Sequence, residues 1–367
     1  MHPRRLLVLV ALAAASLVAA PVSAANINSR NSFTVHALVS DTGVGGSLVD
    51  TNLVNGWGIA ALPTSPWWVA NNHTDTSTLY RGDGTKVPLT VSVPGGPTWI
   101  VANNVATDFL VGSAVDSGAR FIFATEAGEI RGWNPAVPTG PMPPSTVTEV
   151  GSASDDGAIY KGLAIGTVGN DQFLYAADFH HGKVEVYDSS FAEVDWDGAF
   201  EDPGIPTGFA PFGIQNLGGM IFVTYAKQDA DAEDEIGGAG LGYVSAFGTD
   251  GSFLGRVASR GALNAPWGLA WAPLTDGQGH PGFGKFSGDL LVGNFGDGRI
   301  NAFAWTPGGW EARGHLKTAN HHPLVIDGLW GIGFGNGSGS GLITTLYFAA
   351  GPDDESHGLY GSVTSNP

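Results

Sequence analysis

One short pattern recurs six times along the chain and limits what the chain can fold into. Each copy begins with a small apolar segment, usually built around a glycine, and continues with an apolar strand, a turn and another strand. The opening segments are Trp57-Gly58-Ile59-Ala60, Trp99-Ile100-Val101-Ala102, Lys161-Gly162-Leu163-Ala164, Phe212-Gly213-Ile214, Trp267-Gly268-Leu269-Ala270 and Trp330-Gly331-Ile332. A period of roughly 40 to 65 residues, with several short strands and no helical pattern, is typical of β-propeller blades. We therefore predict an all-β fold, a six-bladed β-propeller with four-stranded blades.

The strands within a repeat can be placed from apolar runs and turn residues. In the third repeat they are expected at 162–167, 173–178, 183–187 and 191–195. Asp-Gly pairs at Asp83-Gly84, Asp250-Gly251 and Asp297-Gly298 lie between expected strands, where hairpin turns need residues that accept a positive φ. The sixth repeat offers only three strands before the chain ends, at 330–334, 346–350 and 358–363. We expect the segment Phe33 to Val39, which has no blade of its own, to supply the missing outer strand and close the ring, because closure also removes an exposed sheet edge. The alternative is that residues 26–45 form a disordered tail.

The first 25 residues have the form of a secretory signal peptide. Arg4 and Arg5 precede an apolar run that ends at Ala20, and small residues follow up to a cleavage position after Ala24 or Ala25. The run is shorter than the roughly 20 residues that a membrane-spanning helix needs. We therefore expect a bacterial protein that is secreted or periplasmic, with residues 26–367 forming a single propeller domain and no membrane span.

Composition excludes several chemistries. The sequence has no cysteine, so it has no disulfide, thiolate metal site or cysteine nucleophile. Its formal net charge of −18 disfavours nucleic acid as a partner, since such a surface repels phosphate. The same charge fits either solubility or cation binding. There is no Gly-x-Ser-x-Gly elbow, no phosphate-binding loop motif and no Gly-x-Gly-x-x-Gly that enters a helix, so serine hydrolysis and nucleotide binding are disfavoured.

Several short phrases carry a resemblance to known propellers. They are Asn52-Leu53-Val54-Asn55-Gly56-Trp57-Gly58, Phe123-Ala124-Thr125-Glu126, Tyr175-Ala176-Ala177-Asp178-Phe179, Val223-Thr224-Tyr225-Ala226-Lys227, Gly293-Asn294-Phe295-Gly296-Asp297-Gly298 and Ala349-Ala350-Gly351-Pro352-Asp353-Asp354-Glu355-Ser356-His357-Gly358-Leu359. With them the chain resembles six-bladed propellers of the NHL-repeat class and, more distantly, the gluconolactonase and strictosidine-synthase-like folds. More closely, it resembles a secreted bacterial family found in genomes that encode exosortase (PEP-CTERM) systems. That family implies the fold but brings no established activity. Pro97-Thr98-Trp99 stands where the family would have Pro-Thr-Gly, so we expect a different inner lining in the second blade.

Polar residues gather in the loops that we expect at one end of the ring, where function usually collects in such folds. The candidate ligand-binding face comprises Asn55, Asn72, His73, Glu126, Asp178, His180, Lys227, Asp229, Asn294, Asp297, Asp353, Glu355 and His357. Carboxylate, amide and imidazole groups that converge on a channel suit a divalent cation, calcium or zinc. The candidate metal ligands are Glu126, Asp178, Asn294 and Asp353, and the candidate proton carriers of a catalytic site are His180 and His357. The alternative is that these loops are polar only because they are solvated.

Two functions remain open at this point. The first is a binding module that holds a small molecule, a polymer or a protein on the polar face. The second is a metal-dependent lactonase or esterase of the gluconolactonase type, in which the ion polarises a carbonyl or activates water. The tryptophans Trp57, Trp267 and Trp330 could stack on a sugar or quinone ring, or they could pack the blades together.

Overall fold

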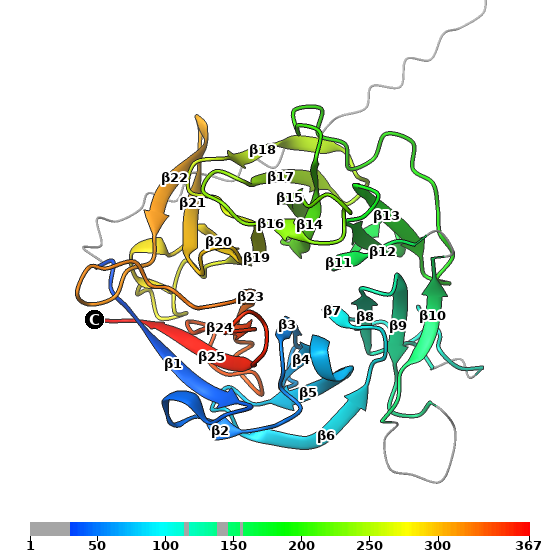
Figure 1. Cartoon of the computed structure of the whole chain (residues 1–367), viewed down its shortest axis with the longest axis horizontal. Helices are drawn as coiled ribbons and strands as arrows, with labels where there is room; N and C mark the ends of the chain where they lie inside the picture. Colours follow the sequence, from blue (N-terminus) through cyan, green and yellow to red (C-terminus); the bar gives the residue numbers. More distant parts are fainter. Residues whose placement is uncertain (1–29, 114–116, 138–145, 155–156) are drawn as a thin grey trace, which may run out of the picture.

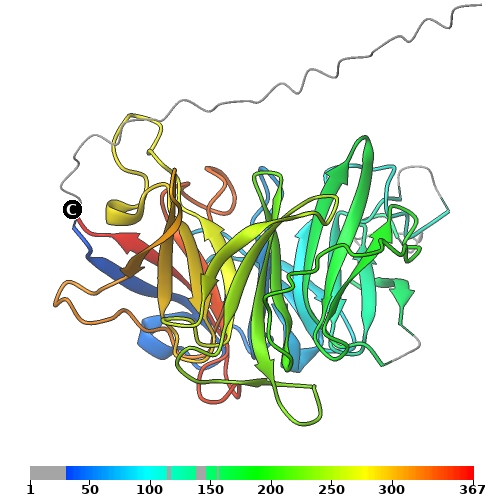
Figure 2. The same cartoon turned by 90° about the horizontal axis from the view of Figure 1, so that it is seen from above.

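Six small β-sheets are arranged around a common axis in the computed structural model, which describes residues 30–113, 117–137, 146–154 and 157–367 (Figure 1). The predicted signal peptide lies outside the described residues. Seen from the side, the strands run between two faces where the connecting loops lie (Figure 2). In the described ranges the helical elements are three short 3-10 turns, η1 (Val44–Gly46), η2 (Asn72–Thr74) and η3 (Gly284–Phe286). Within the same ranges, no helix has the length and hydropathy of a membrane span. The predicted six-bladed, all-β architecture is confirmed.

Each blade is an antiparallel meander whose first strand lies next to the axis. Blade 1 contains β3 (Gly56–Ala60), β4 (Trp67–Asn71), β5 (Thr76–Tyr80) and β6 (Lys86–Ser92), and blade 2 contains β7 (Pro97–Ala102), β8 (Phe121–Thr125), β9 (Glu129–Trp133) and β10 (Glu149–Ala153). Blade 3 contains β11 (Tyr160–Val168), β12 (Asp171–Asp178) and β13 (Lys183–Asp188). Blade 4 contains β14 (Phe209–Leu217), β15 (Met220–Gln228), β17 (Tyr243–Gly248) and β18 (Phe253–Ser259), and the short β16 (Glu235–Ile236) pairs with β15. Blade 5 contains β19 (Pro266–Trp271), β20 (Leu290–Asn294), β21 (Ile300–Thr306) and β22 (Gly309–His315).

The N-terminal strand closes the ring, as predicted. Blade 6 contains β23 (Leu329–Phe334), β24 (Leu346–Ala350) and β25 (Leu359–Ser365), and β1 (Phe33–Ser40) pairs antiparallel with β25 as its outer strand. The two-residue β2 (Leu48–Val49) pairs parallel with the end of β1. The Phe33 ring is buried and lies 4.9 Å from the ring of Phe283, between centroids, and 5.9 Å from that of Phe286. The closing strand therefore also packs against the loop before the second strand of blade 5.

Blade 3 differs from the predicted four strands. The segment expected as its outer strand, 191–195, makes a single bridge between Tyr187 and Glu193. Phe191 has a φ of 64° and turns its buried ring toward Phe109, at 5.3 Å between centroids. The Asp188 carboxylate accepts the backbone N–H groups of Ser190 and Ala192, which a regular strand would present to its neighbour. In place of a fourth strand, this segment buries the Phe191 ring and forms a turn that the Asp188 side chain caps.

The inner strands share one irregularity that brings them together at the axis. All six have a β-bulge in their pairing with the second strand, at the level of the recurring Trp-Gly position. A Cβ atom on Gly213 would lie 2.2 Å from the carbonyl oxygen of Trp267 in the next blade, and one on Gly268 would lie 2.4 Å from that of Trp330. Real Cβ atoms do not approach so closely, so glycine is required at these two positions for the neighbouring inner strands to pack.

Aromatic side chains from these inner strands fill the axis of the ring. The indole of Trp267 lies 5.0 Å from that of Trp330, 5.7 Å from that of Trp57 and 4.5 Å from that of Trp99, between centroids. Trp99 stands at the position that is glycine in the other blades, and its indole adds to the same cluster. The tryptophans therefore pack the blades together, which is one of the two roles expected from the sequence. They also separate one end of the axis from the other.

Truncation of the closing strand should test ring closure. We expect Phe33→Ala to lower the free energy of unfolding by about 3–5 kcal/mol, because it leaves a cavity against Phe283 and Phe286. The matched control is Val35→Ala on the same strand, whose side chain is 37% exposed and whose loss should change stability by less than about 0.5 kcal/mol. Denaturant unfolding measures both, and equal effects of the two substitutions would contradict the packing role of Phe33.

A second substitution tests the contact between inner strands. Gly268→Ala should destabilise the chain by about 1–3 kcal/mol, because the new methyl group meets backbone rather than a movable side chain. Gly308→Ala is the control, since its Cβ would meet only the Thr306 hydroxyl oxygen, at 3.6 Å. Thermal and denaturant unfolding should leave Gly308→Ala close to wild type, and a harmless Gly268→Ala would show that the strands can move apart.

Candidate functional site

A cavity of about 470 Å³ opens at one end of the ring axis. Its walls come mainly from turns that join the second strand of a blade to the strand after it. The lining residues are Trp57, Asn72, His73, Glu126, Lys161, Asp234, Glu235, Phe295, Trp330, Asp354 and Glu355. Of the residues predicted for the ligand-binding face, the structure brings Asn72, His73, Glu126 and Glu355 into this cavity.

The floor of the cavity is aromatic. The rings of Trp57 and Trp330 stack at 3.6 Å between centroids, and Phe295 stacks on Trp330 at 4.0 Å. The Trp330 indole N–H donates to the side-chain oxygen of Asn55 at 3.2 Å. The Trp57 indole nitrogen is buried and has no hydrogen-bond partner among the described residues, although such groups are normally paired in protein interiors.

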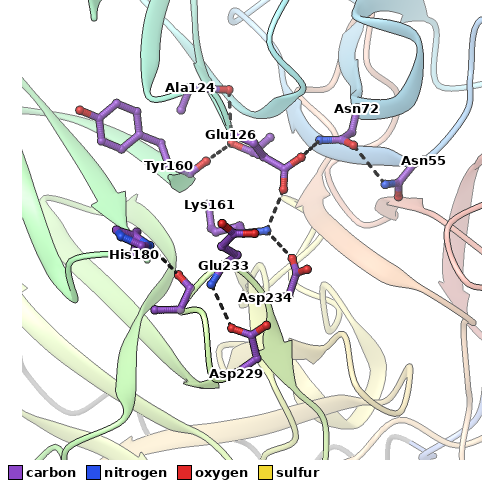
Figure 3. A network of polar contacts seen from close by, with 12 residues as sticks. Asn55, Asn72, Ala124, Glu126, Tyr160, Lys161, His180, Asp229, Glu233 and Asp234 are labelled. Carbon is purple, nitrogen blue, oxygen red and sulfur yellow. Dashed lines mark hydrogen bonds and ion pairs between the residues drawn. The ribbon is translucent and has the colours of Figure 1, made fainter. Parts of the chain in front are cut away.

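A buried lysine, Lys161, lies over this aromatic floor. Lys161 directly precedes Gly162 in β11, where blades 1, 4, 5 and 6 place Trp57, Phe212, Trp267 and Trp330 before their glycines. Its side chain is 2% exposed, and its Nζ lies 2.7 Å from Glu126 Oε1, 3.1 Å from Asp234 Oδ1 and 5.3 Å from the centroid of Trp57 (Figure 3). A cation between two carboxylates and over an indole face is well stabilised.

The protonation state of Lys161 limits its chemistry. Burial alone would lower the pKa of Lys161, but the adjacent Glu126, with Glu235 and Asp234, outweighs it and raises that pKa above its usual value. The side chain is therefore an ammonium ion throughout the physiological pH range. An ammonium ion has no lone pair, so Lys161 cannot act as the nucleophile of a Schiff base.

A chain of amides fixes the second carboxylate oxygen of Glu126. The Asn72 side-chain amide donates to Glu126 Oε2 at 2.9 Å, and the Asn55 amide donates to Asn72 Oδ1 at 3.4 Å (Figure 3). Asn55 in turn accepts the Trp330 indole N–H. The ion pair at the mouth of the cavity is thus tied to the aromatic floor through two side-chain amides.

Two further carboxyl groups, those of Glu235 and Glu355, line the cavity and make no ion pair among the residues that the structure describes. Burial raises the pKa of Glu235, on β16, to about 8, against the opposing effect of Lys161. Burial also raises the pKa of Glu355, against the opposing effect of a side-chain hydrogen bond with Asn55, and its Oε1 atom is buried with no hydrogen-bond partner in the described part of the chain. Glu355 ends a run of three residues with positive φ, since Asp353, Asp354 and Glu355 have φ values of 57°, 49° and 63°.

Four of the other predicted residues lie in local interactions on blades 3 and 4. The buried Asp178 carboxylate accepts from the His181 ring at 2.6 Å and from the backbone N–H of Ile159 at 3.2 Å. His180 Nδ1 lies 3.2 Å from the carbonyl oxygen of Ala232. Lys227 Nζ lies 6.0 Å from the ring centroid of Phe209. Asp229 accepts the backbone N–H of Glu233 at 3.0 Å and so caps a turn (Figure 3).

The remaining predicted residues stabilise loops of blades 5 and 6. Asn294 donates to the Ala262 carbonyl at 2.8 Å and to Asp297 at 3.0 Å. His357 Nδ1 lies 2.7 Å from Asp41 Oδ2, and its Nε2 lies 3.9 Å from the carboxylate of the exposed Asp353.

The four candidate metal ligands are therefore in separate surroundings. Glu126 pairs with Lys161, Asp178 with His181, Asn294 with Asp297, and Asp353 lies at the surface. Within the described ranges, no three His, Asp or Glu side chains are grouped closely enough to hold a metal ion. A calcium or zinc site remains a prediction from the sequence.

The cavity also contains residues that are not in the predicted ligand-binding face, among them Lys161, Asp234, Glu235, Phe295 and Asp354. The signal for Lys161 is present in the repeat itself, because a lysine before the inner-strand glycine breaks an aromatic pattern. A second cavity, of about 310 Å³, lies at the other ends of the inner strands and is lined mainly by apolar residues, with Gln215 among its few polar ones.

Comparison with known proteins identifies the relatives of the chain. The uncharacterized protein R648 of Acanthamoeba polyphaga mimivirus is 32% identical over 340 residues, which cover 90% of this chain and 79% of the viral protein. The uncharacterized protein L690 of the same virus is 33% identical over 348 residues, which cover 90% and 86%. No protein-family model matches the chain. The chain belongs to the family of these mimivirus proteins.

These relatives correct the family predicted from sequence phrases. The expected secreted bacterial family from exosortase-encoding genomes is wrong, because the relatives are viral proteins, and bacterial origin has no support from them. The phrases that suggested it are turns and strand ends, such as Gly293-Asn294-Phe295-Gly296-Asp297-Gly298, whose composition follows from hairpin geometry.

Solved structures agree with the fold. The soluble aldose sugar dehydrogenase of Escherichia coli covers 91% of this chain over its whole length with a TM-score of 0.53 and 13% identity. A glucose dehydrogenase gives a TM-score of 0.55, again with 13% identity, and the match covers 91% of this chain and 99% of the dehydrogenase. At this identity the likeness concerns the fold alone.

The Asp41–His357 pair should make stability depend on pH. Its hydrogen bond to Asp41 raises the pKa of His357 above its usual value. The hydrogen-bonded pair therefore stabilises the folded state fully at pH values below the pKa of histidine in the unfolded chain, about 6.5. This stabilisation is lost as pH rises through the pKa of His357 in the folded chain. We expect the melting temperature of His357→Gln to fall below that of wild type at about pH 5.5 and to approach it at about pH 9. A pH-independent difference would contradict the pair, and His36→Gln, at an exposed histidine of β1, is the control.

Proposed function

We propose that this member of the mimivirus protein family is a binding module whose axial cavity holds a small polar ligand. The observation that carries the proposal is Lys161, a buried cation held by Glu126 and Asp234 where the repeat otherwise supplies an aromatic ring. A buried ion pair contributes little to stability compared with apolar side chains of similar volume, because both charges lose their hydration. An ion pair at an axial position is therefore better explained by what the cavity binds than by the folding of the ring.

Unpaired groups around the cavity support the same proposal. The Trp57 indole nitrogen and Glu355 Oε1 are both buried without a partner, and each such group has a free-energy cost of about 1–3 kcal/mol. A ligand that accepts from the indole and donates to the carboxyl group would remove this cost. The aromatic floor beneath them offers a flat apolar surface of the kind that small-molecule sites combine with a few polar groups. The signal peptide predicted in residues 1–25 adds the proposal that binding takes place outside the cytoplasm.

A ligand screen with a blocked variant tests the proposal. His73 is exposed and lines the mouth of the cavity, so His73→Trp should narrow it without disturbing the fold. The control is Gln215→Trp, which places the same bulk in the cavity at the opposite end of the axis. Amines, carboxylic acids, polyols, sugars and lactones would be tested by thermal shift, where a ligand at a hundred times its dissociation constant stabilises by about 2.7 kcal/mol.

We expect at least one chemical class to raise the melting temperature of wild type and of Gln215→Trp but not of His73→Trp. A screen in which no compound distinguishes the two tryptophan variants would overturn the proposal. Incubation of each lactone with the protein, followed by assay of the free acid, tests the lactonase alternative in the same samples. Turnover that His73→Trp abolishes would replace binding with catalysis as the function of the cavity.

A further inference from the structure

The carboxyl groups of the axial cavity outnumber its cations, and the surplus groups have no cation partner. Five acidic residues line the cavity, Glu126, Asp234, Glu235, Asp354 and Glu355, against Lys161 and His73. Glu126 and Asp234 are paired with Lys161. Glu235, on blade 4, and Glu355, on blade 6, interact with each other by charge repulsion and make no ion pair within the described ranges. The cavity therefore offers a pair of carboxyl groups to a positively charged guest.

Lys161 shows how an ammonium ion is held in this cavity. Its Nζ lies between two carboxylates and 5.3 Å from the centroid of Trp57. Glu235 and Glu355 provide a second pair of carboxyl groups over the same floor, which continues through Trp330 to Phe295. Aromatic faces and carboxylates together favour organic cations over neutral or anionic ligands.

We infer that the ligand of the axial cavity is a small organic amine whose ammonium group is held by Glu235 and Glu355 above the Trp57, Trp330 and Phe295 floor. This inference rests on the proposed binding function and specifies its ligand class. It also uses an unpaired atom of the cavity, since the ammonium donates to Glu355 Oε1.

Binding of an amine should release a proton. The groups that face Glu235 are Lys161, which favours its ionised form, and Glu355 and Asp234, which oppose it, with Glu126, Asp354 and His73 also around the cavity. Because burial raises the pKa of Glu235 to about 8, this carboxyl group is mostly protonated near neutral pH. An incoming ammonium ion favours the carboxylate and displaces the proton. Affinity should therefore rise with pH through about 8 and fall once the amine itself loses its charge, near pH 10.

Titration calorimetry of the full chain with three four-carbon probes tests the inference. Putrescine carries two ammonium groups, butanediol is its neutral counterpart and succinate its anionic counterpart. We expect putrescine to bind wild type at least about tenfold more tightly than either of the others, a difference of roughly 1.4 kcal/mol. The apparent heat of putrescine binding should change with the ionisation enthalpy of the buffer at neutral pH, because a proton is released.

Two glutamine variants test whether Glu235 and Glu355 hold the ammonium group of the bound amine. Glu235→Gln imitates the protonated form of this residue and should fold as wild type does, but it should weaken putrescine binding at least about tenfold and remove the proton release. Glu355→Gln should weaken binding without removing the proton release. Glu201→Gln, at an exposed acid between blades 3 and 4, is the control for loss of one negative charge and should bind as wild type does.

The outcomes separate the ligand class from the proposed function. Equal putrescine binding by wild type, Glu235→Gln and Glu355→Gln would overturn the inference, as would binding with no proton release. If succinate or butanediol binds, His73→Trp blocks it and putrescine does not bind, the ligand class is wrong and the binding function stands. If no probe and no compound of the wider screen is sensitive to His73→Trp, the binding function fails as well.

Discussion

The close contact between neighbouring inner strands is the constraint on which the rest of the ring depends. Gly58, Gly162, Gly213, Gly268 and Gly331 each place a bare Cα against the backbone of the next inner strand, at distances where a Cβ atom would overlap it. The bulge at this level turns the preceding residue toward the axis, and in four of the five blades that residue is aromatic. The bulge with its glycine therefore sets the distance between neighbouring blades and also directs the aromatic side chains that fill the axis.

The candidate site lies where one blade departs from this repeated aromatic-glycine pattern. Blade 3 keeps Gly162 but places Lys161 before it, so an ammonium ion enters a position otherwise occupied by indole or phenyl rings. Two carboxylates from neighbouring blades, Glu126 and Asp234, offset the loss of its hydration. The positions of all three depend on the geometry of the ring and not on any local motif.

This dependence explains how much could be predicted from sequence. Strands, hairpins and ring closure follow from local patterns and from the unpaired edge of blade 6, so the fold and the role of β1 were predictable. The predicted face included Asn72, His73, Glu126 and Glu355 because loop polarity is visible in sequence. Lys161 was missed because its contacts with Glu126 and Asp234 depend on how blades 2, 3 and 4 are placed around the axis. Asp178 and His357 were also predicted, and the structure gives each a hydrogen-bond partner outside the cavity, the His181 ring for Asp178 and Asp41 for His357.

The turn that carries Glu355 has a strained backbone at the edge of the cavity. Three consecutive non-glycine residues, Asp353 to Glu355, have positive φ, which costs of order 1 kcal/mol or more for each residue. The structure holds them there with hydrogen bonds from Asp353 N–H to the Asp327 carboxylate, at 2.9 Å, and from Glu355 N–H to the Gly351 carbonyl, at 3.1 Å. The turn thereby keeps a carboxyl group with an unpaired oxygen in the cavity that Glu235 also lines, and the proposed binding function gives this strain a role.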